Sequence, residues 1–252
     1  EEYLAELASQ QDGADVDLIH RARDAVRGQL GSALADGLLS LYHDLETNEP
    51  YAPDARQIAA RALRNTCLAY LVSADDRNLE LAVQQFGAAD NMTDRLAALR
   101  EIAFYGDDAL REETLDRFYE DWRHEVLVVN QWLQVQASIP DESALSRVQG
   151  LMSHPEFDLH NPNKVRALIG TFANQNPVNF HRADGGGYAL LCDVVIRLNS
   201  LNPQIASRLL APLTRWRNYR GRAELMKGEL ERLAAQPDLS PDVYEIVTKS
   251  LR

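Results

Sequence analysis

Apolar residues recur every three or four positions along most of the chain, which is the spacing of one face of an α-helix. The first clear stripe begins after Asp17 and consists of Ile19, Ala22, Val26, Leu30, Ala33 and Leu34. A second helix is predicted over 54–72, with an inward stripe of Ile58, Ala62, Leu63, Cys67 and Leu71. Further helices are predicted from Asn91 or Thr93, where either side chain can cap, and as one or two helices over 112–136. No stretch alternates as a β-strand does, so the chain is predicted to be all-α.

Four motifs in the second half place a capping residue directly before a proline: Asn161-Pro162, Asn176-Pro177, Asn202-Pro203 and Ser240-Pro241. The capping side chain accepts a hydrogen bond from a free N–H of the first turn, and proline at the first helical position has no N–H to satisfy. Two stripes follow the first and third motifs: Val165, Leu168, Ile169 and Phe172, then Ile205, Leu209, Leu213 and Trp216. Helices that recur at about 40 residues are typical of armadillo and HEAT repeats. We therefore expect a superhelical array of antiparallel helix pairs.

Composition and charge narrow the possible partners. The 252 residues carry a formal net charge of −12, which disfavours binding to nucleic acid or to an anionic membrane surface. No apolar run is long enough to span a membrane, and the start EEYLAELASQ has neither Met nor a signal core. That start lies within a helical pattern and indicates a piece of a longer polypeptide. Cys67 and Cys192 fall within helical patterns, which favours buried thiols in a reducing, cytoplasmic setting.

One basic stretch, RWRNYRGR, interleaves Arg215, Arg217, Arg220 and Arg222 with two aromatic residues. Such a pattern can bind single-stranded nucleic acid by charge and stacking. The favoured interpretation is a helix end and turn, in which Trp216 is buried and the arginines are solvated or paired with Glu224 and Glu229. The acidic charge of the whole chain supports this second interpretation.

No catalytic motif is complete in this sequence. His124-Glu125 begins the HExxH zinc motif, but Val128 stands at the position of the second histidine. His43 and Glu46 are interpreted as a surface pair. The triple glycine in RADGGGYALL follows a helical segment and lacks the Lys-Ser/Thr of a phosphate-binding loop. We therefore predict that Gly185–Gly187 are positive-φ positions of a hinge between two helices.

The second half resembles the C-terminal domain of the bacterial aminopeptidase N family, the alanyl aminopeptidases of the gluzincin zinc peptidases. The similar stretches begin at Asn161-Pro-Asn-Lys-Val-Arg-Ala-Leu-Ile-Gly170 and continue through Phe172-Ala, Asn176-Pro, Phe180-His, Gly187-Tyr188, Asn202-Pro-Gln, Ala206-Ser-Arg-Leu209 and Tyr244-Glu-Ile-Val-Thr-Lys249. Earlier matches are Asp15-Val-Asp-x-Ile-His20, Arg61-Ala-Leu-Arg-Asn-Thr-Cys-Leu68 and Asn91-Met-Thr-Asp94. The resemblance covers almost the whole chain and implies one helical C-terminal domain over 1–252 that lacks its first helices.

The resemblance also implies that the catalytic residues lie in a different domain from this chain. In this family the zinc motif HExxH and the exopeptidase motif GxMEN lie in an upstream catalytic domain, and neither motif occurs in this chain. The chain would hold no cofactor, the parent enzyme would hold zinc, and the helical domain would cover the active-site chamber. Matched position by position, Arg166 and Arg208 would face peptide in that chamber, with Gln204 close by. Each arginine has the alternative of an ordinary surface salt bridge.

The function predicted from the sequence is therefore that of a catalytically silent domain of a cytoplasmic zinc aminopeptidase. Its partners would be the parent's own catalytic domain and the peptide substrate, with no nucleic acid and no membrane. A free-standing helical-repeat adaptor that binds a protein on its concave face is the alternative, because composition and periodicity fit both. An RNA-binding role through the basic stretch is a third option that the negative charge disfavours.

Overall fold

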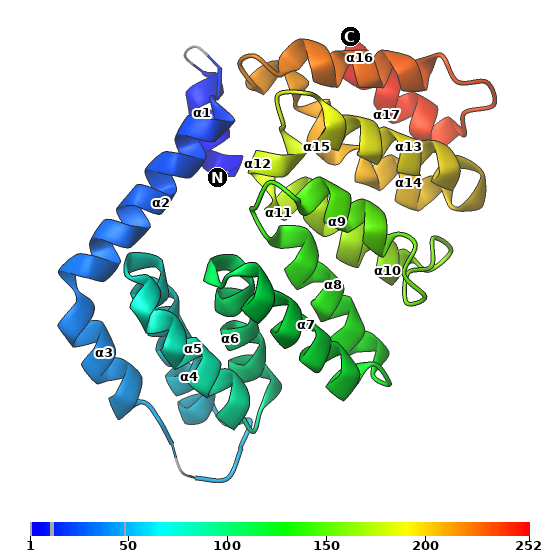
Figure 1. The fold of residues 1–252 in the computed structure, drawn as a ribbon. Helices are drawn as coiled ribbons and strands as arrows, with labels where there is room; N and C mark the ends of the chain where they lie inside the picture. The colour runs from blue at the N-terminus through cyan, green and yellow to red at the C-terminus, as the bar shows by residue number, and fades with distance from the viewer. Residues whose placement is uncertain (1, 11–12, 48) are drawn as a thin grey trace. The chain divides into compact units, whose positions relative to one another are not determined.

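A computed structural model describes residues 2–10, 13–47 and 49–252, and within these ranges the chain is helical, without a β-strand. The described chain divides into two compact units, unit 1 (Glu1–His20 and His124–Arg252) and unit 2 (Arg21–Arg123). The all-α prediction is confirmed (Figure 1). No described helix combines the length and the apolar character needed to cross a lipid bilayer. A single domain over 1–252 stays a prediction.

Unit 2 contains the C-terminal part of α2 and the helices that follow it. Their bounds are α2 Val16–Ala33, α3 Ala35–Asp44, α4 Ala55–Ala74, the 3₁₀ turn η1 Asp76–Asn78, α5 Leu79–Ala88, α6 Met92–Tyr105 and α7 Asp108–Trp122. Helix α4 packs against α3 and α6, and α6 packs against α5 and α7. Asn91 caps α6 by accepting a hydrogen bond from the Asp94 N–H at 3.0 Å, as one of the two predicted caps.

Unit 1 contains α1, the first turn of α2 and the helices after α7. Their bounds are α1 Glu2–Ser9, α8 Val126–Ser138, α9 Ala144–Leu151, α10 Pro162–Val165, the π-helix η2 Arg166–Gly170, α11 Thr171–Gln175, α12 Pro177–Phe180, α13 Gly186–Leu201, α14 Pro203–Leu209, α15 Ala211–Thr214, the 3₁₀ turn η3 Trp216–Asn218, α16 Ala223–Ala234 and α17 Pro241–Leu251. Helices α13 and α14 pack against each other and against α16 and α17, respectively.

Three of the four predicted capping motifs form as expected. Asn161, Asn202 and Ser240 each accept a hydrogen bond from a backbone N–H of the following turn. Asn176 is the exception. Its side chain is buried and donates to the Ala137 and Ile139 carbonyls at 3.0 and 2.8 Å, at the end of α8. The last carbonyls of a helix have no partner inside the helix, so this amide is used to satisfy them instead of capping α12.

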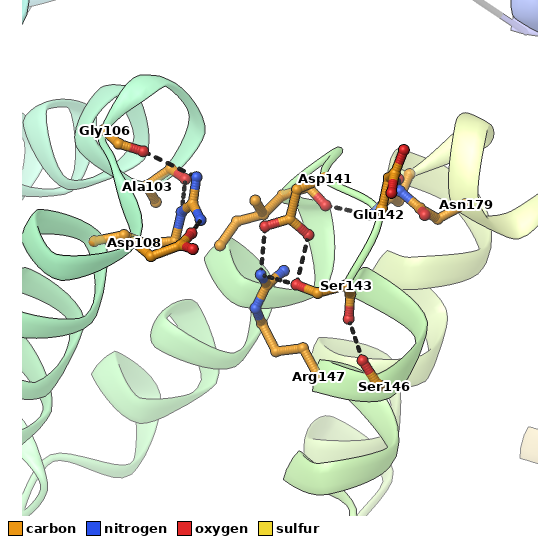
Figure 2. Close-up of polar contacts among 12 residues, drawn as sticks. Ala103, Gly106, Asp108, Asp141, Glu142, Ser143, Ser146, Arg147 and Asn179 are labelled. Carbon is orange, nitrogen blue, oxygen red and sulfur yellow. Dashed lines mark hydrogen bonds and ion pairs between the residues drawn. The ribbon is translucent and has the colours of Figure 1, made fainter.

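One arginine side chain in each unit closes a turn (Figure 2). In unit 2, Arg111 donates to the Ala103 carbonyl at 2.7 Å and to the Gly106 carbonyl at 3.0 Å, across the turn between α6 and α7. In unit 1, Arg147 donates to the Asp141 carboxylate and to the Ser143 hydroxyl, across the start of α9. A guanidinium carries five N–H donors in one plane, which suits it to hold several acceptors of a turn at once.

The predicted stripes are buried in unit 1 and largely exposed in unit 2. Val165, Leu168, Ile169 and Phe172 are each at most 1% exposed. In unit 2, by contrast, Val26 and Leu30 of the first predicted stripe are 56% and 44% exposed. The prediction also fails for the first half of α4, where Ile58 is 52% exposed. Cys67 and Leu71, the last members of that stripe, are buried as expected, and both cysteines are buried free thiols.

On α4 the inward positions of the first two turns belong to polar side chains. Gln57 and Arg61 are buried, and Arg61 donates to the Gln57 amide oxygen at 3.0 Å. Gln57 also holds the segment before the helix, because its amide donates to the Pro50 carbonyl at 3.0 Å and accepts from the Ala52 N–H at 2.9 Å. The need to satisfy this loop orients the helix so that Ile58 faces outward.

Candidate substrate-contact site

Arg166 lies at the start of a π-helical turn that interrupts the helix following Asn161. The Thr171 N–H donates to the Arg166 carbonyl five residues earlier, which is the hydrogen bond of a π-helix. The Arg166 side chain is exposed, and its guanidinium donates to the Asn163 amide oxygen at 3.2 Å. Asn163 is neutral, so this contact orients the guanidinium without cancelling its charge. Neither this turn nor the Asn163 contact was predicted from the sequence.

Gln204 and Arg208 lie one turn apart on α14. The Asn202 side chain caps this helix through the Ile205 N–H at 3.1 Å, and Pro203 occupies its first position. Because residues four apart share a helix face, the two side chains extend from the same side of α14, and both are exposed. Among the residues that the structure describes, Arg208 forms no ion pair, so the salt-bridge alternative is not observed for it.

The π-helical turn and α14 contact each other through Gly170. The position that a side chain would occupy at Gly170 lies 3.8 Å from Arg166 Cβ and 3.9 Å from Leu209 Cδ2. Leu209 is buried and follows Arg208 directly. The two arginines therefore extend from segments that meet in unit 1, as expected if the helices that carry them stack. Contact of any of these side chains with a peptide stays a prediction.

The glycine loop begins α13, and a carboxylate of the chain itself lies at the N-terminus of this helix. Gly185 has the predicted positive φ, at +73°, but Gly186 and Gly187 do not, which corrects part of the prediction. Gly187 is required for another reason, because a Cβ there would lie 2.3 Å from the Phe180 carbonyl oxygen. The Asp184 carboxylate accepts the Gly186 N–H at 2.9 Å and pairs with Arg182, which holds the pKa of Asp184 below its usual range. A carboxylate thus already occupies the anion position of this helix.

The basic stretch 215–222 forms ion pairs with the N-terminal segment of unit 1. Among the described residues, it does not pair with Glu224 or Glu229, which were the expected acidic partners. Arg220 pairs with Asp15 at 3.3 Å and Arg222 with Asp17 at 3.0 Å. Glu229, one of the expected partners, pairs with Arg232 instead. The prediction of Glu224 and Glu229 as partners was wrong, because it considered only residues nearby in sequence. The true partners lie more than 200 residues earlier.

Backbone contacts complete this clasp, which we define as the pairing of 13–17 with 218–222. The Ala14 N–H donates to the Asn218 carbonyl at 2.7 Å, and the Arg220 N–H donates back to the Ala14 carbonyl at 2.9 Å. Trp216 is half-buried, not fully buried as predicted, and its indole N–H donates to the Ser250 carbonyl at 3.1 Å. Arg217 stacks on the Trp216 ring at 4.0 Å. The aromatic and basic groups of the stretch thus serve internal contacts.

The described residues of this chain do not fit a zinc site. His124 lies in the turn between α7 and α8, so the partial HExxH motif is not on a helix. Within the part of the chain that the structure describes, no group of three His, Cys, Asp or Glu side chains could hold a metal ion. We therefore derive no chemical step through a metal for these residues.

The architecture in both units is that of stacked helical repeats, and comparison with known proteins gives the family. Residues 2–252 match the model of a family described as a domain of unknown function (DUF3458_C) with ARM repeats, and the chain belongs to that family. This agrees with the predicted armadillo/HEAT-like solenoid of antiparallel helix pairs.

The matched relatives give a narrower identification than the family model does. Over 98% of the present chain, the sequence is 41% identical to aminopeptidase N of Caulobacter vibrioides. Over 94% of the present chain, it is 41% identical to aminopeptidase N of Haemophilus influenzae. The structure of Legionella pneumophila aminopeptidase A in complex with aspartic acid matches 98% of the chain with a TM-score of 0.87 and 30% identity. The predicted resemblance to the C-terminal domain of bacterial aminopeptidase N is thereby confirmed. The chain spans 29%, 27% and 30% of these three proteins.

Proposed function

We propose that this chain is the helical C-terminal domain of a cytoplasmic zinc aminopeptidase that removes N-terminal amino acids from peptides. The observation that carries the proposal is the identity of about two residues in five with aminopeptidase N along nearly the whole chain. In this proposal the zinc and the residues that cleave the peptide bond belong to polypeptide outside this chain. The domain itself covers the active-site chamber and is inactive alone.

The residues proposed to contact substrate are Arg166, Arg208 and Gln204. A peptide held by its N-terminus at a catalytic centre extends carbonyl oxygens and a terminal carboxylate away from that centre. A guanidinium remains charged at every physiological pH and binds such oxygens in a planar, bidentate manner. Two exposed arginines on helical segments that meet at Gly170 are suited to bind the distal part of the peptide.

The first test uses the 252-residue chain itself. Purified chain is expected to bind no stoichiometric zinc and to leave an alanyl anilide uncleaved, because the described residues form no metal site. Cleavage, or one tightly bound zinc per chain, would refute the proposal. Mass determination of the protein in its native source separates the alternatives, since a free-standing adaptor has no attached catalytic polypeptide.

The second test concerns the substrate contacts in the full-length aminopeptidase. Arg208→Ala should raise the KM for peptides of several residues about tenfold, as expected for one charge-assisted hydrogen bond, and leave the KM for single-residue amides unchanged. Arg56→Ala, at an exposed arginine of unit 2, is the matched control and should change neither value. Equal effects of Arg208→Ala on both substrate classes would exclude a contact beyond the first residue.

A further inference from the structure

The Arg166 guanidinium is held at one nitrogen and leaves one edge available. Its Nη1 donates to the Asn163 amide oxygen at 3.2 Å, and among the described residues the side chain makes no other hydrogen bond and no ion pair. A guanidinium carries its five N–H groups on Nε, Nη1 and Nη2. The edge formed by Nε and Nη2 therefore remains open. Two parallel N–H groups of this kind bind both oxygens of one carboxylate.

Arg182, in the same unit, shows how such an edge binds a carboxylate. Its Nε and Nη2 donate to the two oxygens of the Asp184 carboxylate at 3.1 and 2.9 Å. Arg166 has the same donors on an exposed side chain, but its neighbour Asn163 is an amide. Because an amide oxygen is a neutral acceptor, Asn163 orients the guanidinium and leaves its full charge for a ligand.

The side of Arg166 that faces α14 has no side chain beside it in the next turn. Gly170 stands there, and a Cβ at this position would lie 3.8 Å from Arg166 Cβ and 3.9 Å from Leu209 Cδ2. A longer side chain would therefore extend between the π-helical turn and α14. Arg208 on α14 is a second exposed guanidinium without an ion pair among the described residues. The glycine thus keeps open the space beside Arg166 on the side of Arg208.

We propose that Asn163 is a positioning residue for Arg166, and that the edge it leaves open binds the C-terminal carboxylate of the peptide substrate. This inference rests on the proposed function and names its substrate class, which is peptides with a free carboxyl terminus in preference to the same peptides with a terminal amide. A carboxylate offers two anionic oxygens to Nε and Nη2, whereas a terminal amide offers one neutral oxygen.

Steady-state kinetics of the full-length aminopeptidase test this preference. The substrates are alanyl peptides of increasing length, each as the free acid and as the C-terminal amide. Peptide length sets where the carboxylate lies, so at least one length should show a KM about tenfold lower for the free acid, as expected for a charge-assisted pair. The kcat should be equal for the two forms, because the contact is far from the bond that is cleaved. Arg166→Ala should abolish the difference in KM.

Variants of Asn163 separate positioning from a general structural role. Asn163→Asp keeps the shape of the side chain but places a carboxylate beside Arg166, so it should abolish the preference for the free acid. Asn163→Ala leaves the charge of Arg166 and removes its orienting contact, and should reduce the preference about threefold. In the Arg166→Ala background Asn163→Ala should have no further effect on the preference. Gln149→Glu, the same amide-to-carboxylate change at an exposed residue of α9, is the matched control and should keep the preference.

The outcomes are separable. Equal KM values for acid and amide at every length, or a preference that survives Asn163→Asp, overturns the proposal. Asn163→Ala that changes the kinetics of all substrates by one factor, single-residue amides included, would show a structural role alone and also overturn it. Cleavage of peptides without a preference for the free acid refutes this inference and leaves the proposed function standing. A full-length protein that cleaves no peptide refutes the proposed function and this inference with it.

Discussion

The stripe that follows Asn161 and the apolar positions Ala22, Val26 and Leu30 of α2 (the α2 stripe) have the same helical spacing but opposite surroundings. Leu168 is fully buried, whereas Val26 is more than half exposed. Helical periodicity identifies the face of a helix that is suited to packing, but it does not identify what packs there. In unit 1 the partner helices are part of the chain. In unit 2 the apolar side chains Val26 and Leu30 of α2 are exposed, and Gly31 and Arg27 make the contacts of this helix with α4.

The largest expected difference between the two stripes is in stability. Leu168→Ala should lower the free energy of unfolding by about 2–5 kcal/mol, because it removes buried methyl groups and leaves a cavity. Leu30→Ala should change it by less than about 0.5 kcal/mol in the 252-residue chain. Urea denaturation followed by circular dichroism measures both. A loss of several kcal/mol for Leu30→Ala would mean that the α2 stripe is covered within the chain itself.

The glycine contact of α2 is tested by adding one methyl group. Alanine is the better helix former by about 1 kcal/mol, but Gly31→Ala places its Cβ against the Tyr70 backbone. We expect a net loss of about 1–3 kcal/mol, since the clash is with backbone and forces the helices apart. Gly37→Ala in α3 meets nothing within 4 Å and should stabilise by about 0.5–1 kcal/mol. Urea denaturation of both variants measures this, and a Gly31→Ala variant more stable than the wild type would contradict the close packing of α2 and α4.

The clasp of unit 1 is held by ion pairs and hydrogen bonds, whereas the preceding contacts are apolar. Arg222 pairs with Asp17 and also donates to the His181 carbonyl at 2.6 Å, with its side chain only 17% exposed. Arg222→Ala should cost about 1–3 kcal/mol, because it removes a half-buried ion pair and takes this donor away from the carbonyl of the buried His181. The exposed Arg220–Asp15 pair provides the control, and Arg220→Ala should cost at most about 1 kcal/mol. Chemical denaturation that gave equal losses would argue against a special role for Arg222.

The smallest expected effect is a change in pH dependence at the inner side of α2. Glu101 is buried with Arg27 Nη2 at 3.8 Å, and burial raises the pKa of Glu101. The folded state therefore holds this proton more tightly than the unfolded state. Its contribution to stability is present below the ordinary glutamate pKa of about 4.3 and is lost as pH rises through the raised value.

Glu101→Gln should remove this component of the pH dependence. Unfolding free energies of wild type and variant, measured by urea titration between pH 4 and pH 8, are expected to diverge as pH rises, with the wild type becoming relatively less stable. Glu112→Gln, at an exposed glutamate of α7, is the control for the loss of one negative charge. A wild type that gains stability relative to Glu101→Gln as pH rises would show that the Arg27 pair outweighs burial.

Local sequence signals predicted much of the local structure. The caps at Asn91, Asn161, Asn202 and Ser240 formed, because a cap needs only its own residue and the next three. The same signal failed at Asn176, since two carbonyls at the end of α8, more than 35 residues away, use its amide. The partners of Arg220 and Arg222 could not be predicted from nearby residues either. For the candidate site, the sequence supplied Arg166, Arg208 and Gln204 through resemblance, but not the π-helical turn or the Gly170 contact between their segments.

By itself the sequence determined the helical class, the repeat architecture and most helix starts, because these depend on spacing and on residues within one or two turns. Tertiary structure alone decided which apolar faces are covered, since burial depends on partners that are distant in sequence. It made Ile58 an outward residue because Gln57 and Arg61 hold the preceding loop. It likewise turned Val26 and Leu30 outward, because only a glycine fits between α2 and the Tyr70 backbone.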